Sequence, residues 1–80
     1  MNKAAFANRQ EQLLTQLREA RLAAGLRQTE LAERLGTPQS FVSKYESGER
    51  RLDLLELQQI CQALNLSLTN FVRAFEEASQ

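Results

Sequence analysis

Apolar residues recur at helical spacing along nearly the whole chain, and this pattern predicts helices throughout. The first predicted helix runs from about Arg9 to Ala24, because its composition favours helix and it lacks Pro and Gly. Its apolar stripe consists of Leu13, Leu14, Leu17, Ala20 and Ala24. Gly25 ends this helix. Residues 1–8 show little periodicity and are expected to form a frayed tail.

The segment 28–35 predicts a short second helix. Leu31, Ala32 and Leu35 fall on one helical face, and Ala32 is small where another helix must cross closely. Gly36 follows at once, and glycine readily takes the positive φ that closes a helix. Arg27 stands at the expected N-cap without a suitable capping side chain, at a cost of about 1 kcal/mol.

A third helix is predicted from Pro38 to Ser47, with Thr37 as its N-cap and Pro38 at its first position. Val42 and Tyr45 mark its inner face. The outward positions carry hydrogen-bonding side chains and no acid, which suits reading the edges of DNA bases. They are Gln39, Ser40, Ser43 and Lys44.

The last third of the chain predicts two more helices after a loop at 48–52. Asp53 resembles an N-cap, with Glu56 completing a capping box. The fourth helix runs to about Leu64, and its inward residues are Leu54, Leu57, Ile60, Cys61 and Leu64. Asn65 suits a left-handed C-cap and Ser67 a new N-cap. The fifth helix carries Leu68, Phe71, Val72 and Phe75.

The predicted fold is therefore all-α, with five helices and no strand. A length of 80 residues allows one domain with one small core, expected over residues 9–80. No apolar run approaches the roughly 20 residues that span a bilayer, and the first residues do not resemble a signal peptide. The expected location is the cytoplasm.

The amino-acid composition limits which metal sites and enzyme activities the chain could support. The chain has one Cys and no His, so it lacks the ligands of a Cys/His zinc site and the usual general base. Cys61 lies on an apolar helical face and is expected to be buried. No Gly-rich phosphate loop or nucleophile elbow is present. We therefore expect no enzyme activity, no metal and no cofactor.

The net charge is zero, but its distribution is uneven. Residues 1–17 carry a net +1 and residues 18–51 a net +2, whereas residues 52–80 carry a net −3. The basic excess is modest, so we expect weak nonspecific affinity for nucleic acid and dependence on dimer formation.

The segment from Gln28 to Gly48 resembles the helix-turn-helix of the phage repressor and Cro type, the Xre family. The resemblance extends from about Leu14 to Phe71 and rests on the following residues: Gln28, Leu31, Ala32, Leu35, Gly36, Val42, Tyr45, Glu46, Ser47 and Gly48. In that family the second helix of the pair enters the major groove of DNA.

The resemblance implies roles for individual residues. Base contacts are expected from Gln39, Ser40, Ser43 and Lys44, the alternative being an ordinary solvated face. Contacts to the DNA backbone are expected from Gln28, Thr37, Phe41, Arg50 and Arg51. Phe41 has two interpretations, since it either packs on a thymine methyl or sugar or covers the edge of the core.

Two further expectations concern structure and assembly. The resemblance implies a structural ion pair between Arg21 and Glu46. On the fifth helix, Leu68 either helps close the core or joins Val72 and Phe75 in a dimer interface. A two-fold dimer would read half-sites about 10 bp apart in a palindromic operator.

The leading functional hypothesis is thus a sequence-specific transcription regulator, a repressor or controller protein, that binds double-stranded DNA as a homodimer. The alternative is a protein-interaction module or an antitoxin whose main partner is another protein. A toxin and RNA polymerase are the protein partners considered. The sequence does not show which of these small regulators the protein is.

Overall fold

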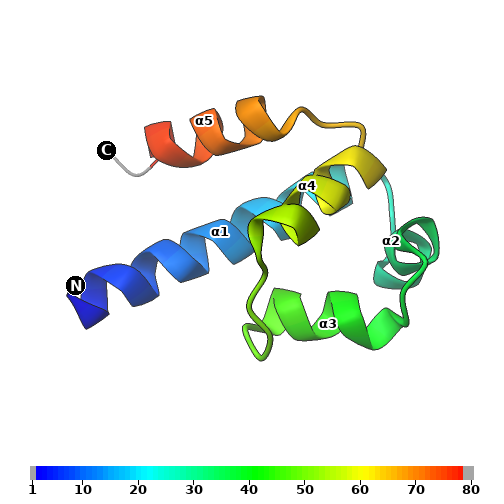
Figure 1. Ribbon diagram of the computed structural model, residues 1–80, viewed down its shortest axis with the longest axis horizontal. Coiled ribbons are helices and arrows are strands. Elements are labelled where there is room, and N and C mark those ends of the chain that lie inside the picture. The colour runs from blue at the N-terminus through cyan, green and yellow to red at the C-terminus, as the bar shows by residue number, and fades with distance from the viewer. Residues whose placement is uncertain (1, 79–80) are drawn as a thin grey trace.

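Five helices make up the structure, a computed structural model that describes residues 2–78 (Figure 1). Their bounds are α1 Lys3–Ala23, α2 Gln28–Leu35, α3 Gln39–Ser47, α4 Leu54–Ala63 and α5 Leu68–Ala78. No strand occurs among the described residues, so the predicted all-α class is confirmed. No helix in residues 2–78 is long and apolar enough to span a membrane.

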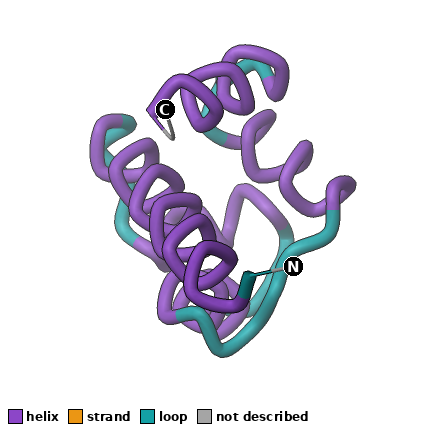
Figure 2. The backbone as a smooth tube through the Cα atoms, turned by 90° about the vertical axis from the view of Figure 1, so that its left-hand side faces the viewer, coloured by secondary structure: helices purple, strands orange, loops and turns teal. Residues whose placement is uncertain are grey.

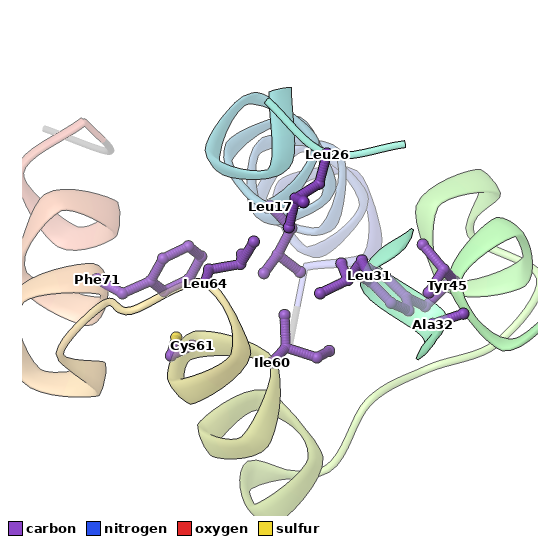
Figure 3. Close-up of a cluster of buried hydrophobic side chains, with 10 residues drawn as sticks. Leu17, Leu26, Leu31, Ala32, Tyr45, Ile60, Cys61, Leu64 and Phe71 are labelled. Atoms are coloured by element: carbon purple, nitrogen blue, oxygen red, sulfur yellow. The ribbon is translucent and has the colours of Figure 1, made fainter. Parts of the chain in front are cut away.

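One core joins all five helices (Figure 3). It consists of Leu17, Leu26, Leu31, Ala32, Val42, Tyr45, Ile60, Cys61, Leu64 and Phe71. The small Ala32 lies where α2 and α3 approach, as the spacing predicted. Burial raises the pKa of the Cys61 thiol, so this side chain is a protonated small hydrophobe at neutral pH.

The turn between α2 and α3 is closed by Gly36, which has φ of +69°. The Thr37 N–H donates to the carbonyl of Ala32 at 3.0 Å, which satisfies the end of α2. The backbone of Thr37 therefore caps the C-terminus of α2. The prediction that it caps α3 is wrong, because the extended residue before that helix is Pro38, with ψ of 153°.

The first helix begins earlier than predicted. Its N-cap is Asn2, whose side chain accepts a hydrogen bond from the Ala5 N–H at 3.1 Å. The two extra turns are almost wholly exposed, which is why they lack an apolar stripe. The expected frayed tail at residues 1–8 is therefore wrong for residues 3–8, which are helical; Met1 lies outside the described residues.

Two side chains predicted to face inward are exposed. Ala24 falls beyond the last residue of α1, in the turn before Gly25. Leu54 is 67% exposed in the first turn of α4, where no other helix covers it. The caps of α4 follow the prediction, with Asp53 accepting from the Glu56 N–H at 2.7 Å.

The N-terminus of α2 compensates in part for its unsuitable N-cap residue. The Arg27 side chain makes no capping hydrogen bond, but the Glu30 carboxylate accepts from the Arg27 N–H at 2.8 Å. This is the second half of a capping box. Beyond α4, Asn65 takes φ of +58° as predicted, and Ser67 Oγ accepts from the Asn70 N–H at 3.3 Å.

Candidate nucleic-acid interface

The helix α3 forms one edge of the molecule, with α2 packed beside it (Figure 1). Val42 and Tyr45 are fully buried and anchor its inner face to the core. Of the four side chains predicted to read bases, three are exposed and Ser43 is half-buried. The three exposed ones are Gln39, Ser40 and Lys44. The structure therefore brings the four to one accessible helix, with Gln39 at its first position.

A side-chain relay connects the first residues of α2 and α3. Gln39 Nε2 donates to Gln28 Oε1 at 2.9 Å. Gln28 Nε2 in turn donates to Glu46 Oε1 at 3.0 Å. The two glutamine amides thus have fixed orientations relative to the helix termini they stand on. Both residues are predicted contact residues, but the bond between them is not evident from the sequence, where the only signal is a Gln in the first turn of each helix.

The far end of the relay is the ion pair that the resemblance implies. Arg21 Nε donates to Glu46 Oε2 at 2.7 Å and Arg21 Nη2 to Glu46 Oε1 at 3.0 Å. The side chains of the two residues are only 8% and 5% exposed. Hydrogen bonding to Glu46 raises the pKa of Arg21 despite the opposing effect of burial. This bidentate pair ties α1 to the end of α3.

A third bond of the arginine extends the same anchor. Arg21 Nη1 donates to the carbonyl of Leu26 at 2.8 Å, in the turn before α2. One guanidinium therefore holds α1, the turn before α2 and the end of α3 together. Hydrogen bonds thus link four side chains in series: Gln39, Gln28, Glu46 and Arg21. The orientation of Gln39 on α3 therefore depends on the buried Arg21 of α1.

Two of the residues predicted to contact the DNA backbone also have structural roles beside α3. Thr37 is half-buried, and its Oγ1 lies 3.5 Å from the Ala32 carbonyl. Phe41 is half-buried and packs against the core, with its ring edge-on to Tyr45 at a centroid distance of 5.6 Å. Of its two interpretations, covering the core edge is what the contacts show, and part of its surface remains accessible.

The loop 48–53 carries two arginines with different partners. Arg50 Nη2 donates to Glu56 Oε2 at 2.6 Å, and its guanidinium carbon lies 4.7 Å from the centre of the Phe41 ring. This pair raises the pKa of Arg50 and lowers that of Glu56. Arg51 is exposed, with its guanidinium carbon 5.2 Å from the Phe6 ring centre. Arg50 thus holds the loop against α4 while its side chain stays 42% exposed.

The side chains predicted for a dimer interface are half-buried on α5. Leu68 packs against the core, so the prediction that it helps close the core is confirmed. Phe75 lies under the Arg9 guanidinium, whose carbon is 4.5 Å from the ring centre. Val72 lines a shallow hollow on the outer side of α5 with Thr69. Only part of the predicted apolar face is therefore open to solvent.

The described residues offer no group of three or more His, Cys, Asp or Glu side chains close enough to hold a metal ion. The exposed side chains at 39, 40 and 44 on α3 are instead hydrogen-bonding or cationic, and the exposed Arg51 follows in the loop after the helix. Such a surface suits an anionic, hydrogen-bonding partner.

Comparison with known proteins identifies this arrangement. A family described as helix-turn-helix matches residues 17–71, well over half of the chain. The structure also resembles an XRE-family like protein from Pseudomonas syringae pv. tomato str. DC3000. That likeness has 44% identity and a TM-score of 0.91, over 98% of this chain and 95% of that one. The chain belongs to the XRE family of helix-turn-helix proteins.

A more distant XRE-like neighbour is the clp gene regulator ClgR from C. glutamicum. It shares 25% identity at a TM-score of 0.76, over 90% of this chain and 92% of that one. No curated protein matches the sequence. The family assignment makes this XRE protein a DNA-binding transcription regulator, with α2 and α3 as its helix-turn-helix.

Proposed function

We propose that this XRE protein is a sequence-specific repressor or controller protein that binds a palindromic operator as a homodimer. In this proposal α3 enters the major groove and Gln39, Ser40, Ser43 and Lys44 meet the base edges. It assigns the protein no catalytic role and no cofactor.

The observation that carries the proposal is the bond between Gln39 and Gln28. The Gln39 amide has two N–H donors and one carbonyl acceptor, and one of its N–H groups donates to Gln28 Oε1. The remaining N–H and the Oε1 atom form the donor and acceptor pair that matches N7 and N6 of adenine. A glutamine held in this way loses less side-chain entropy when it binds a base.

Contacts to phosphates would then set the position of α3 in the groove. Gln28 stands at the N-terminus of α2, where unpaired N–H groups favour an anion, and its amide retains a second N–H. Thr37 precedes α3, Phe41 lies in its first turn, and the positively charged Arg50 and Arg51 follow it. These contacts add affinity without adding sequence preference.

A homodimer follows from the modest size of one reading surface. Helix α3 has only nine residues, and the net charge of the chain is zero. One copy would therefore gain little from nonspecific attraction to phosphates. Two copies related by a two-fold axis double the base contacts and require half-sites about 10 bp apart. The sequence predicts Val72 and Phe75 for that interface, with Leu68 either beside them or in the core.

The proposal is tested by selection from a random pool of duplex DNA at low salt. We expect enrichment of a palindrome whose half-sites lie about one helical turn apart. Gln39→Ala should change the preferred base at one position in each half-site and weaken binding by about 1–3 kcal/mol per contact. Asn8→Ala is the matched control, because Asn8 is an exposed amide side chain on α1. Absence of any enrichment would favour the protein-interaction alternative.

A further inference from the structure

The first turn of α4 exposes two adjacent leucines. Leu54 is 67% exposed and Leu55 is 69% exposed. The other exposed large apolar side chains of residues 2–78 are less open, with Leu22 the next at 55%. Figure 2 places the start of α4 at an edge of the molecule, where the loop 48–53 enters the helix. An exposed apolar pair at this point loses free energy unless another surface covers it.

Leu54 continues an apolar stripe that is buried elsewhere on α4. The stripe runs from Leu54 through Leu57, Cys61 and Leu64, at successive spacings of three, four and three residues. Cys61 and Leu64 belong to the core and Leu57 packs against it. The core-facing side of the helix thus extends one turn beyond the part that this chain covers. The surface is a continuation of the core with no partner among the described residues.

The charges around this leucine pair suit a second copy of the same chain. In a two-fold interface a surface meets itself, so unpaired like charges would repel. Along α4 and into α5, residues 57–72 contain no charged residue at all. The exposed charges that flank Leu54 in sequence are Arg51 and Asp53, which have opposite signs. Glu56 is already paired with Arg50.

We infer that a second copy of this chain docks on the first turn of α4, with Leu54 and Leu55 at the centre of the two-fold interface. The inference rests on the proposed function, because it names the surface through which the operator-binding homodimer forms. Interface centres are depleted of charge and apolar, as this surface is. A standard interface takes about 800 Å² from each partner, so the leucines would be its centre and neighbouring uncharged residues its rim.

This location also connects the dimer to the reading surface. Only residues 48–53 separate the end of α3 from the start of α4. The proposed contact is therefore separated from the reading helix by only these six residues in each copy. In each copy the Arg50–Glu56 pair fixes the loop between interface and α3. The dimer contact would set the spacing of the two half-sites.

The test is sedimentation velocity on the full chain without DNA, at concentrations from about 1 to 200 µM. Three variants are compared with the natural chain: L54E/L55E, L54K/L55K, and Leu22→Glu as a matched exposed leucine on α1. We expect the natural chain and Leu22→Glu to dimerise. Each double variant should weaken the dimer at least about 100-fold, since it removes four buried leucines and places like charges together.

Mixing the two double variants separates loss of the interface from loss of folding. If the two α4 surfaces face each other, the Glu and Lys variants should form a heterodimer when combined, because their charges are then opposite. A double variant that remains dimeric alone, or a mixture that stays monomeric, would overturn the inference. So would a natural chain that is monomeric throughout the range.

DNA selection tests the proposed function separately from the dimer interface. If Val72→Glu alone gives a monomer while L54E/L55E stays dimeric, the interface lies on α5 and the inference about α4 fails, but operator binding stands. If the natural chain selects no DNA sequence, the proposed function fails whatever the sedimentation result. The two failures therefore give different pairs of results.

Discussion

Replacing Arg21 by Ala should destabilise the fold strongly, because it leaves a buried carboxylate without its cation. The guanidinium makes two bonds to Glu46 and one to the Leu26 carbonyl. Both side chains of the ion pair are more than nine-tenths buried. Breaking one side of such a pair costs about 3–5 kcal/mol. The remaining partner of Glu46 is the amide of Gln28, which supplies one hydrogen bond.

The assay is thermal unfolding followed by far-ultraviolet circular dichroism at pH 7. For a domain of this size 1 kcal/mol corresponds to about 4–8 °C in Tm, so the Tm should fall by at least about 12 °C. Arg18→Ala is the control, since Arg18 is an exposed arginine on the same helix; it should change Tm by no more than about 4 °C.

A double-mutant cycle then separates the ion pair from the rest of the guanidinium's contacts. The variants are Arg21→Met, Glu46→Gln and their combination. If the pair is the source of stability, the double variant should lose clearly less than the sum of the two single variants. An Arg21→Ala variant that melts within about 3 °C of the natural chain would refute the reasoning. So would an exactly additive cycle, since it would show no coupling between the two groups.

Three more predictions concern single residues. Gly48→Ala should lower stability by about 1–2 kcal/mol in urea unfolding, because φ is +87° there while a Cβ would meet only Leu14 at 3.5 Å; an unchanged midpoint would contradict this. The pKa of Glu56 is lowered in the folded protein, so the Glu56 carboxylate stabilises the fold above its ordinary pKa, and this stability is lost as pH falls through the lowered pKa. In Glu56→Gln the Tm should therefore fall less steeply as the pH is lowered. Cys61, which is 1% exposed with a raised pKa, should react with Ellman's reagent only after denaturant is added; prompt reaction in buffer would show that the core opens.

The sequence predicted the helices where periodicity and capping agree. The α2–α3 turn illustrates this, since Gly36 and the apolar face of Leu31 and Ala32 independently mark the same boundary. The capping box at Asp53 and Glu56 did the same for α4. Local chemistry decides these positions, and local chemistry is what a sequence displays.

Errors arose where tertiary context decides. The first turns of α1 have no apolar stripe because they extend past the core, so only the Asn2 cap marks their start. Leu54 has the periodicity of a core residue, yet it lies beyond the helices that cover Cys61. Periodicity shows which face of a helix is apolar but does not show how far along the helix a covering surface extends.

The candidate site was predictable as a set of residues and not as a network. A helix-turn-helix resemblance assigns Gln28 and Gln39 to adjacent helix starts, but it does not show that their amides bond at 2.9 Å. Nor does it show that Arg50, expected at the DNA backbone, also bridges to Glu56. Such links depend on side-chain geometry across two or more elements. They determine how rigidly the reading surface is held.

If α3 is the surface that reads DNA, an NMR titration should show contact on that helix. Protein labelled with ¹⁵N is titrated with the duplex recovered by selection. We expect the largest shifts at the backbone amides of Gln39 to Lys44 and at the side-chain amides of Gln28 and Gln39. Little change is expected on the outer face of α5, around Thr69 and Arg73. Shifts that gather on α5 or α1 and leave both glutamine side chains unmoved would contradict this expectation.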